Sequence, residues 1–176
     1  KDVPVTCAEM RTTFVIEPRS DMTEVSDFAF IDFGGTLIMR GRFSGLTRIG
    51  IRAFSHEADD IPEMNTRSSI IFGPDALPAL VEIAAGAFNR FSGELQIVGS
   101  SFPKLQLIGV EAFQHLGRSS VVELNGLASL VEVGAEAFEG AQGTVAFAGA
   151  VPLLKRIDFE AFKELSASSV VDLREM

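Results

Sequence analysis

The stretch Leu105-Gln106-Leu107-Ile108-Gly109-Val110-Glu111-Ala112-Phe113 decides the fold, because its apolar pattern returns along the chain. A period in the twenties indicates supersecondary units that cannot bury their apolar faces alone and must stack into a solenoid. The sequence therefore predicts one solenoid domain over residues 1–176 with about six repeats, in which residues 1–24 form a partial N-terminal repeat or cap. The clearest mark of each repeat is the dipeptide Ala-Phe, which recurs in steps of 24, 34, 25, 25 and 24 residues and begins at Ala29, Ala53, Ala87, Ala112, Ala137 and Ala161.

The residues around each Ala-Phe pair have a helical spacing. Ile108, Ala112 and Leu116 stand at i, i+4 and i+8, and Phe113 stands three residues before Leu116, so all four would share one side of a short helix. We therefore expect short helical or 3-10 turns whose Phe rings stack in a buried column. The third residue after each Phe is apolar in every unit except one, where it is Glu57; the others are Phe33, Phe91, Leu116, Ala141 and Leu165.

Between these turns the apolar period changes to two. The segments 95–99 and 122–126 each place two apolar residues on one face before a glycine, which is typical of a short strand followed by a turn. Because such strands arrive once per repeat in the same sense, we expect a parallel sheet along the concave face of the solenoid. The outward positions of these strands, besides Ile38, are the predicted partner-binding residues: Arg40, Gln96, Val98, Glu123, Asn125, Ala146, Ala148 and Asp172.

The 34-residue step carries about ten extra residues, which we place at about 56–66. Insertions in solenoids form surface loops. Four carboxylates lie in this segment, but their spacing lacks the alternating ligands and the positioned glycine of a calcium loop. A solvated acidic loop is therefore favoured over a metal site.

Composition excludes several classes of partner. A formal net charge of −9, with the 15 basic residues scattered, argues against binding to nucleic acid. No stretch approaches 18 consecutive apolar residues, so we expect no direct insertion into a membrane. Cys7 is the only cysteine, which excludes an intramolecular disulfide.

No motif indicates catalysis. The sequence has no phosphate-binding glycine loop, no metal-ligand spacing and no nucleophile elbow. His56 and His115 are the only histidines, and each stands two residues after a Phe, so we expect both to be surface residues of the repeat. We therefore predict a protein that is not an enzyme and needs no cofactor or metal.

The form Leu-x-x-Ile-Gly-x-x-Ala-Phe, nearly literal at 105–113 and 46–54, resembles the BspA-like leucine-rich repeat, and the resemblance extends from about Val25 to Leu173. It implies an α/β leucine-rich-repeat solenoid with a parallel β-sheet on the concave face and short helical or 3-10 turns opposite. It also implies a secreted or cell-surface module that binds a host or cell-surface protein, typically in adhesion or recognition.

Two alternatives stay open. The chain could be a structural unit that self-assembles into a surface coat, because the predicted strand at 170–173 would expose apolar surface on the C-terminal repeat and offer a homo-oligomer contact. It could instead be an intracellular scaffold. A cytoplasmic location is accordingly the alternative to an extracellular or cell-surface one.

Overall fold

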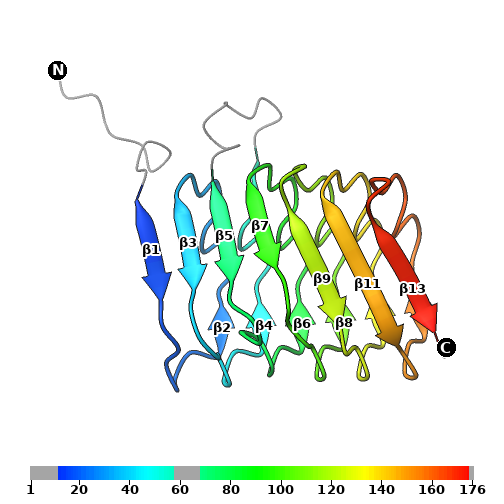
Figure 1. Ribbon diagram of the computed structural model, residues 1–176, viewed down its shortest axis with the longest axis horizontal. Helices are drawn as coiled ribbons and strands as arrows, with labels where there is room; N and C mark the ends of the chain where they lie inside the picture. The colour runs from blue at the N-terminus through cyan, green and yellow to red at the C-terminus, as the bar shows by residue number, and fades with distance from the viewer. Residues whose placement is uncertain (1–11, 58–67, 175–176) are drawn as a thin grey trace.

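The computed structural model describes residues 12–57 and 68–174, which form a parallel β-solenoid built from two sheets. Figure 1 shows the strands of the larger sheet side by side, from β1 in blue to β13 in red, with the shorter strands in a second row. The seven-stranded sheet contains β1 (Thr13–Ile16), β3 (Thr36–Met39), β5 (Ser69–Phe72), β7 (Glu94–Ile97), β9 (Val121–Asn125), β11 (Thr144–Ala150) and β13 (Val170–Arg174). The six-stranded sheet contains β2 (Glu24–Val25), β4 (Arg48–Ile49), β6 (Glu82–Ile83), β8 (Leu107–Ile108), β10 (Glu132–Val133) and β12 (Arg156–Ile157).

Each strand pairs in parallel with the equivalent strand of the next coil, which confirms the predicted solenoid and its repeat. In the six-stranded sheet the paired residues are separated by the same steps as the Ala-Phe dipeptides, as Glu132 opposite Leu107 illustrates. β3 pairs directly with β5, Thr36 opposite Ser69, so the longest step leaves the sheet uninterrupted. Most of the insertion predicted at about 56–66, and residues 1–11 of the predicted cap, lie outside the described residues.

The helical turns, and with them the α/β class, were a wrong prediction: residues 12–57 and 68–174 contain no helix. In the turn around Phe113, Glu111 and His115 have φ of 55° and 54°, and equivalent residues of other turns do the same. A helix requires every residue to have φ near −60°, so two left-handed residues per turn exclude it. Ile108, expected on the helix, lies in β8 instead.

The turns form a third hydrogen-bonded side of the solenoid. The N–H groups of Glu111, Phe113 and His115 donate to carbonyls of the next turn at 2.9, 2.7 and 2.8 Å. The left-handed residues rotate alternate peptide groups along the stacking direction, so backbone groups that a helix would satisfy internally are satisfied between coils. Each coil is thus held to its neighbours on three sides.

The predicted Phe column is confirmed. Consecutive rings stack with centroids 5.1 to 5.3 Å apart and planes within 10° of parallel. Phe72 and Phe147 pack edge-on against the column from the seven-stranded sheet. The column consists of Phe30, Phe54, Phe88, Phe113, Phe138 and Phe162.

Candidate functional site

The residues predicted to bind a partner lie at the outward positions of the seven-stranded sheet. In β9, Glu123 and Asn125 are half-buried, whereas Val122 and Leu124 are fully buried against the core. This alternation follows from the period of two along a strand. The outer face is therefore composed of every second residue.

Strand pairing brings six of the eight predicted residues together, and Val98 directly follows β7. Ala148 in β11 lies between its partners Asn125 in β9 and Asp172 in β13. Glu123 and Ala146 are likewise paired. We call this set the outer patch; it consists of Gln96, Val98, Glu123, Asn125, Ala146, Ala148 and Asp172.

Arg40 lies apart from the outer patch. It follows β3, whereas the patch begins at β7, and β5 lies between these two strands. Its side chain is exposed. The sequence predicted the outward position of Arg40 but not this separation.

Several outward residues were missed, among them Ile71, Val121 and Val170, the last of which pairs with Ala146. Ile71 in β5 pairs with both Ile38 and Gln96, so it continues the face toward the N-terminus. The insertion before β5 hid the register of this strand. Val121, which pairs with Gln96, was also missed, although its alternation with Glu123 would have revealed it.

The outer face mixes apolar and polar side chains, and its polar groups are partly used within the sheet. Val98 is 39% exposed, and Ile71 and Val121 are half-buried. The Gln96 side-chain amide donates to Glu94 at 3.1 Å, and Glu123 accepts the N–H of Gly99 at 3.0 Å. The face therefore offers small and β-branched side chains interspersed with amides and carboxylates.

Known proteins give no guide to this face. No protein-family model, curated protein or solved structure matches the chain. In the part of the chain that the structure describes, no helix is long and apolar enough to cross a bilayer.

The six-stranded side has a different surface, because its charged side chains pair with one another. Arg48 lies 2.8 Å from Asp27, 3.4 Å from Glu82 and 3.8 Å from Glu24. The hydrogen bond from the N–H of Ile51 has the largest effect in lowering the pKa of Asp27, and the hydrogen bond from the Arg48 side chain has the next largest. These pairs are at least partly exposed and contribute little stability. The charged groups on this side of the molecule are therefore paired with one another and in contact with water.

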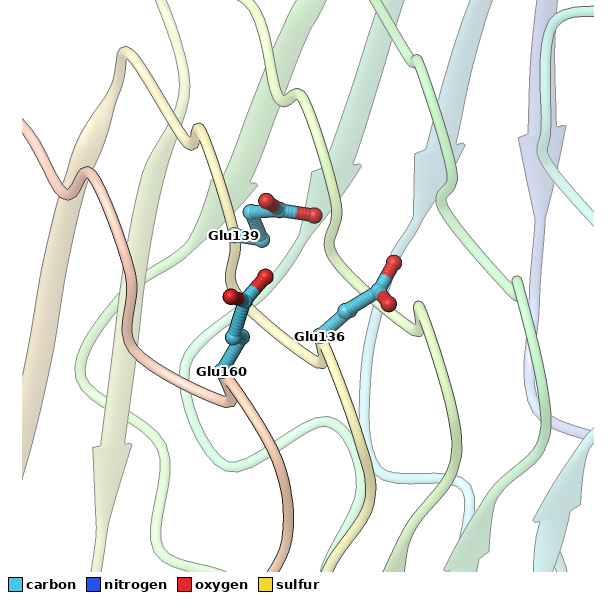
Figure 2. A group of neighbouring side chains, drawn as sticks. All are labelled: Glu136, Glu139 and Glu160. Carbon is cyan, nitrogen blue, oxygen red and sulfur yellow. The ribbon is translucent and has the colours of Figure 1, made fainter.

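An acidic trio lies along the turns. Figure 2 shows the carboxylates of Glu136 and Glu139, from one turn, with that of Glu160 from the next. One oxygen from each lies within 4.8 Å of the others. The Gln114 amide donates to Glu136 and Glu139 at 2.8 Å, and the Lys163 ammonium contacts Glu139 and Glu160 at 2.8 Å.

The trio is a closed polar network. The hydrogen bond from Lys163 has the largest effect in lowering the pKa of Glu139, and the hydrogen bond from Gln114 has the next largest. In turn, the carboxylates of Glu139 and Glu160 raise the pKa of Lys163. The ammonium therefore already offsets one of the three negative charges. We assign no metal to these carboxylates.

A polar groove of about 430 Å³ crosses the second to fourth turns. The groove is open here because Gly86 and Ser55 are small, whereas the equivalent positions of later turns hold longer side chains, such as Glu111 and Gln114. Its walls lack the apolar surface that ligand pockets usually have. The lining residues are Arg52, Ser55, His56, Glu57, Asn89, Arg90, Glu111 and Gln114.

The two histidines do not share one environment. His115 is exposed, whereas His56 is only 2% exposed, so the surface position predicted for His56 was wrong. They belong to different turns, the second and the fourth. His56 is the one that the core encloses.

Proposed function

We propose that this chain is a non-catalytic protein-binding module that contacts its partner through the outer face of the seven-stranded sheet. The carrying observation is the contrast between the two sheets. Exposed apolar surface favours an interaction site. Val98 and Val170, 39% and 56% exposed, stand on the seven-stranded side, and Ile157, 39% exposed, stands in β12, so the two sheets differ in their charged residues more than in exposed apolar surface. The charges of the six-stranded side already pair with one another.

The dimensions of the face constrain the partner. Seven strands about 4.8 Å apart span about 29 Å, and strands of four to seven residues are about 13 to 23 Å long. The flat area is thus about 400 to 650 Å², below the roughly 800 Å² that each partner usually contributes to a stable complex. A stable partner must also contact the loops at the strand ends.

We also propose that the chain is a divergent BspA-like leucine-rich repeat protein acting in adhesion or recognition at the cell surface or after secretion. The resemblance supports this proposal, and the motif residues Ile108, Ala112 and Phe113 are fully buried, as scaffold positions should be. Specificity would then reside in the outward residues, which do not repeat. A self-assembling coat unit and an intracellular scaffold stay alternative predictions.

The proposal is tested by adding charge to the outer patch. The double variant Val98→Arg, Ala146→Arg should capture at least about tenfold less of the binding partner, because an unpaired charge buried in an interface costs several kcal/mol. The measurement is affinity capture from a labelled surface-protein fraction of intact cells, followed by titration of each captured protein.

The matched control adds the same charges on the six-stranded side, at Gln106 and Val131, which are adjacent through a backbone hydrogen bond. This control should bind as the wild type does. Equal binding by all three proteins, with equal melting temperatures, would show that the outer face is not the contact surface. Loss of binding only in the control would assign the site to the other side.

A further inference from the structure

His56 fills a gap in a row of core residues. The residues three after each column Phe are buried at Phe91, Leu116 and Ala141, but Glu57 stands in this row and is exposed. The ring of His56 takes the vacant place, with its centroid 4.9 Å from that of Phe91. A one-residue slip beside the insertion thus puts an ionisable group where other coils bury a hydrocarbon.

The backbone shows the same slip. Residues two after each column Phe, such as Arg90 and His115, have φ of 56° and 54°, whereas His56 does not have a positive φ. Its side chain therefore leaves the surface row to which sequence position would assign it. The altered backbone and the buried ring are two results of one local change.

The hydrogen bonds define the protonation state of the ring. The backbone N–H of Ser92 donates to Nδ1 of His56 at 3.3 Å, and the Ser92 hydroxyl lies 3.2 Å from the same nitrogen. Because Nδ1 accepts, the proton of the neutral ring is on Nε2. Among the described residues Nε2 makes no hydrogen bond of normal geometry, a condition that one other buried side-chain atom, Oγ of Ser69, shares. Ser69 begins β5, so both atoms flank the insertion. The carbonyls of Phe33 and Arg90 nevertheless lie close enough to the ring to favour its protonated form.

We propose that His56 is a pH-sensitive switch: its neutral ring seals the core between the second and third turns, and its protonation opens that junction. A proton on Nδ1 would face the Ser92 N–H, donor against donor, and would place a charge in the core. This proposal does not depend on the proposed function.

The surrounding charges do not compensate a protonated ring. Burial lowers the pKa of His56, and the Asp32 carboxylate with the carbonyls of Phe33 and Arg90 acts in the opposite direction without reversing the shift. Asp32, from the first turn, also accepts the N–H of Glu57 at 3.0 Å.

The other charges around the junction are partly engaged with one another. Arg52, from the second turn, lies 3.4 Å from Glu57. Arg90, from the third turn, brings a positive charge to the same edge. The neutral ring is therefore the form that fits this site.

The sign of the pH effect follows. The pKa of His56 in the folded protein is below its ordinary value of 6.5, so the unfolded chain binds the proton more readily. The stability contribution is complete above about pH 6.5 and is lost as the pH falls toward the folded pKa. In that window the unfolding equilibrium constant rises by up to about tenfold per pH unit.

The test compares urea unfolding of the wild type, His56→Leu and His115→Gln between about pH 8 and pH 5, above the range in which most carboxylates titrate. Leucine is chosen because Leu116 fills this row in the fourth turn. The wild type and His115→Gln should lose stability below about pH 6.5, whereas His56→Leu should not. A wild-type pH dependence in His56→Leu would overturn the proposal.

A second measurement keeps the proposal testable if His56→Leu fails to fold. The wild type has only two histidines, so the NMR signals of both rings can be assigned with His115→Gln. The ring of His56 should be the Nε2–H tautomer and should still be neutral at pH 6.5, and Ser92 amide exchange should accelerate on acidification after correction for its intrinsic rate. A His56 ring that titrates at or above pH 6.5 would overturn the proposal.

Discussion

Phe113→Ala is expected to lower the free energy of unfolding by about 3 to 5 kcal/mol. The ring is fully buried and stacks between Phe88 at 5.2 Å and Phe138 at 5.1 Å. The hydrogen-bonded ladders on three sides fix the spacing of the coils, so the surrounding residues cannot collapse into the cavity. A large cavity term adds to the lost burial.

Chemical denaturation measures this difference, and Gln96→Ala is its control. Gln96 is half-buried on the outer face, and its side-chain amide bonds to the neighbouring Glu94. Its replacement should change stability by no more than about 1 kcal/mol. Equal denaturation midpoints for the two variants would contradict a stability role for the Phe column.

Gly109→Ala should destabilise the protein by about 3 kcal/mol or more, because the added methyl group has no space. A Cβ at Gly109 would lie 2.6 Å from the nitrogen of Ala85 and 2.7 Å from the carbonyl carbon of Ala84. Both atoms are backbone, so neither can move without shifting the preceding coil. The N–H of Gly109 also donates to Ile83 at 2.8 Å, which holds the two coils together at this point.

The control for this variant comes from the same row of the repeat. Ala84 follows β6 as Gly109 follows β8, and its buried methyl group is accommodated. Ala84→Gly should cost only about 1 to 2 kcal/mol, from the lost methyl group and the more flexible backbone. Thermal unfolding that ranked Ala84→Gly as the more damaging change would contradict the close contact at Gly109.

The seven-stranded sheet and the buried column were predictable from sequence because both depend on side-chain periodicity. Glu123 and Asn125 alternate with buried residues, and Phe113 recurs at one place in each repeat. The six-stranded sheet was not predictable in this way, since its strands have two residues, as in Leu107–Ile108, and two residues carry no period. The outer patch was predictable because the alternation that reveals the strands also reveals their outward residues. Ile71 was missed because the insertion interrupts the repeat just before its strand.

The error about helical turns has a conformational cause. Ile108, Ala112 and Leu116 do share a buried side, as the i, i+4, i+8 spacing predicts, but they do so because the coil curves around the core. The sign of φ at Glu111 decides between a helix and this arc. Positive φ is usually associated with glycine, so a glutamate at that position gives no warning.

The three-sided ladder also determines how the molecule would respond to stretching. Backbone bonds join each coil to its immediate neighbours, so tension applied to the two ends of the chain can detach one coil without loosening the next. A detached coil of 24 or 25 residues extends to about 80 Å, although it occupies only about 5 Å of the stack. Under a pulling force this domain would lengthen one coil at a time, and the coil that carries the insertion would add a longer increment than the others.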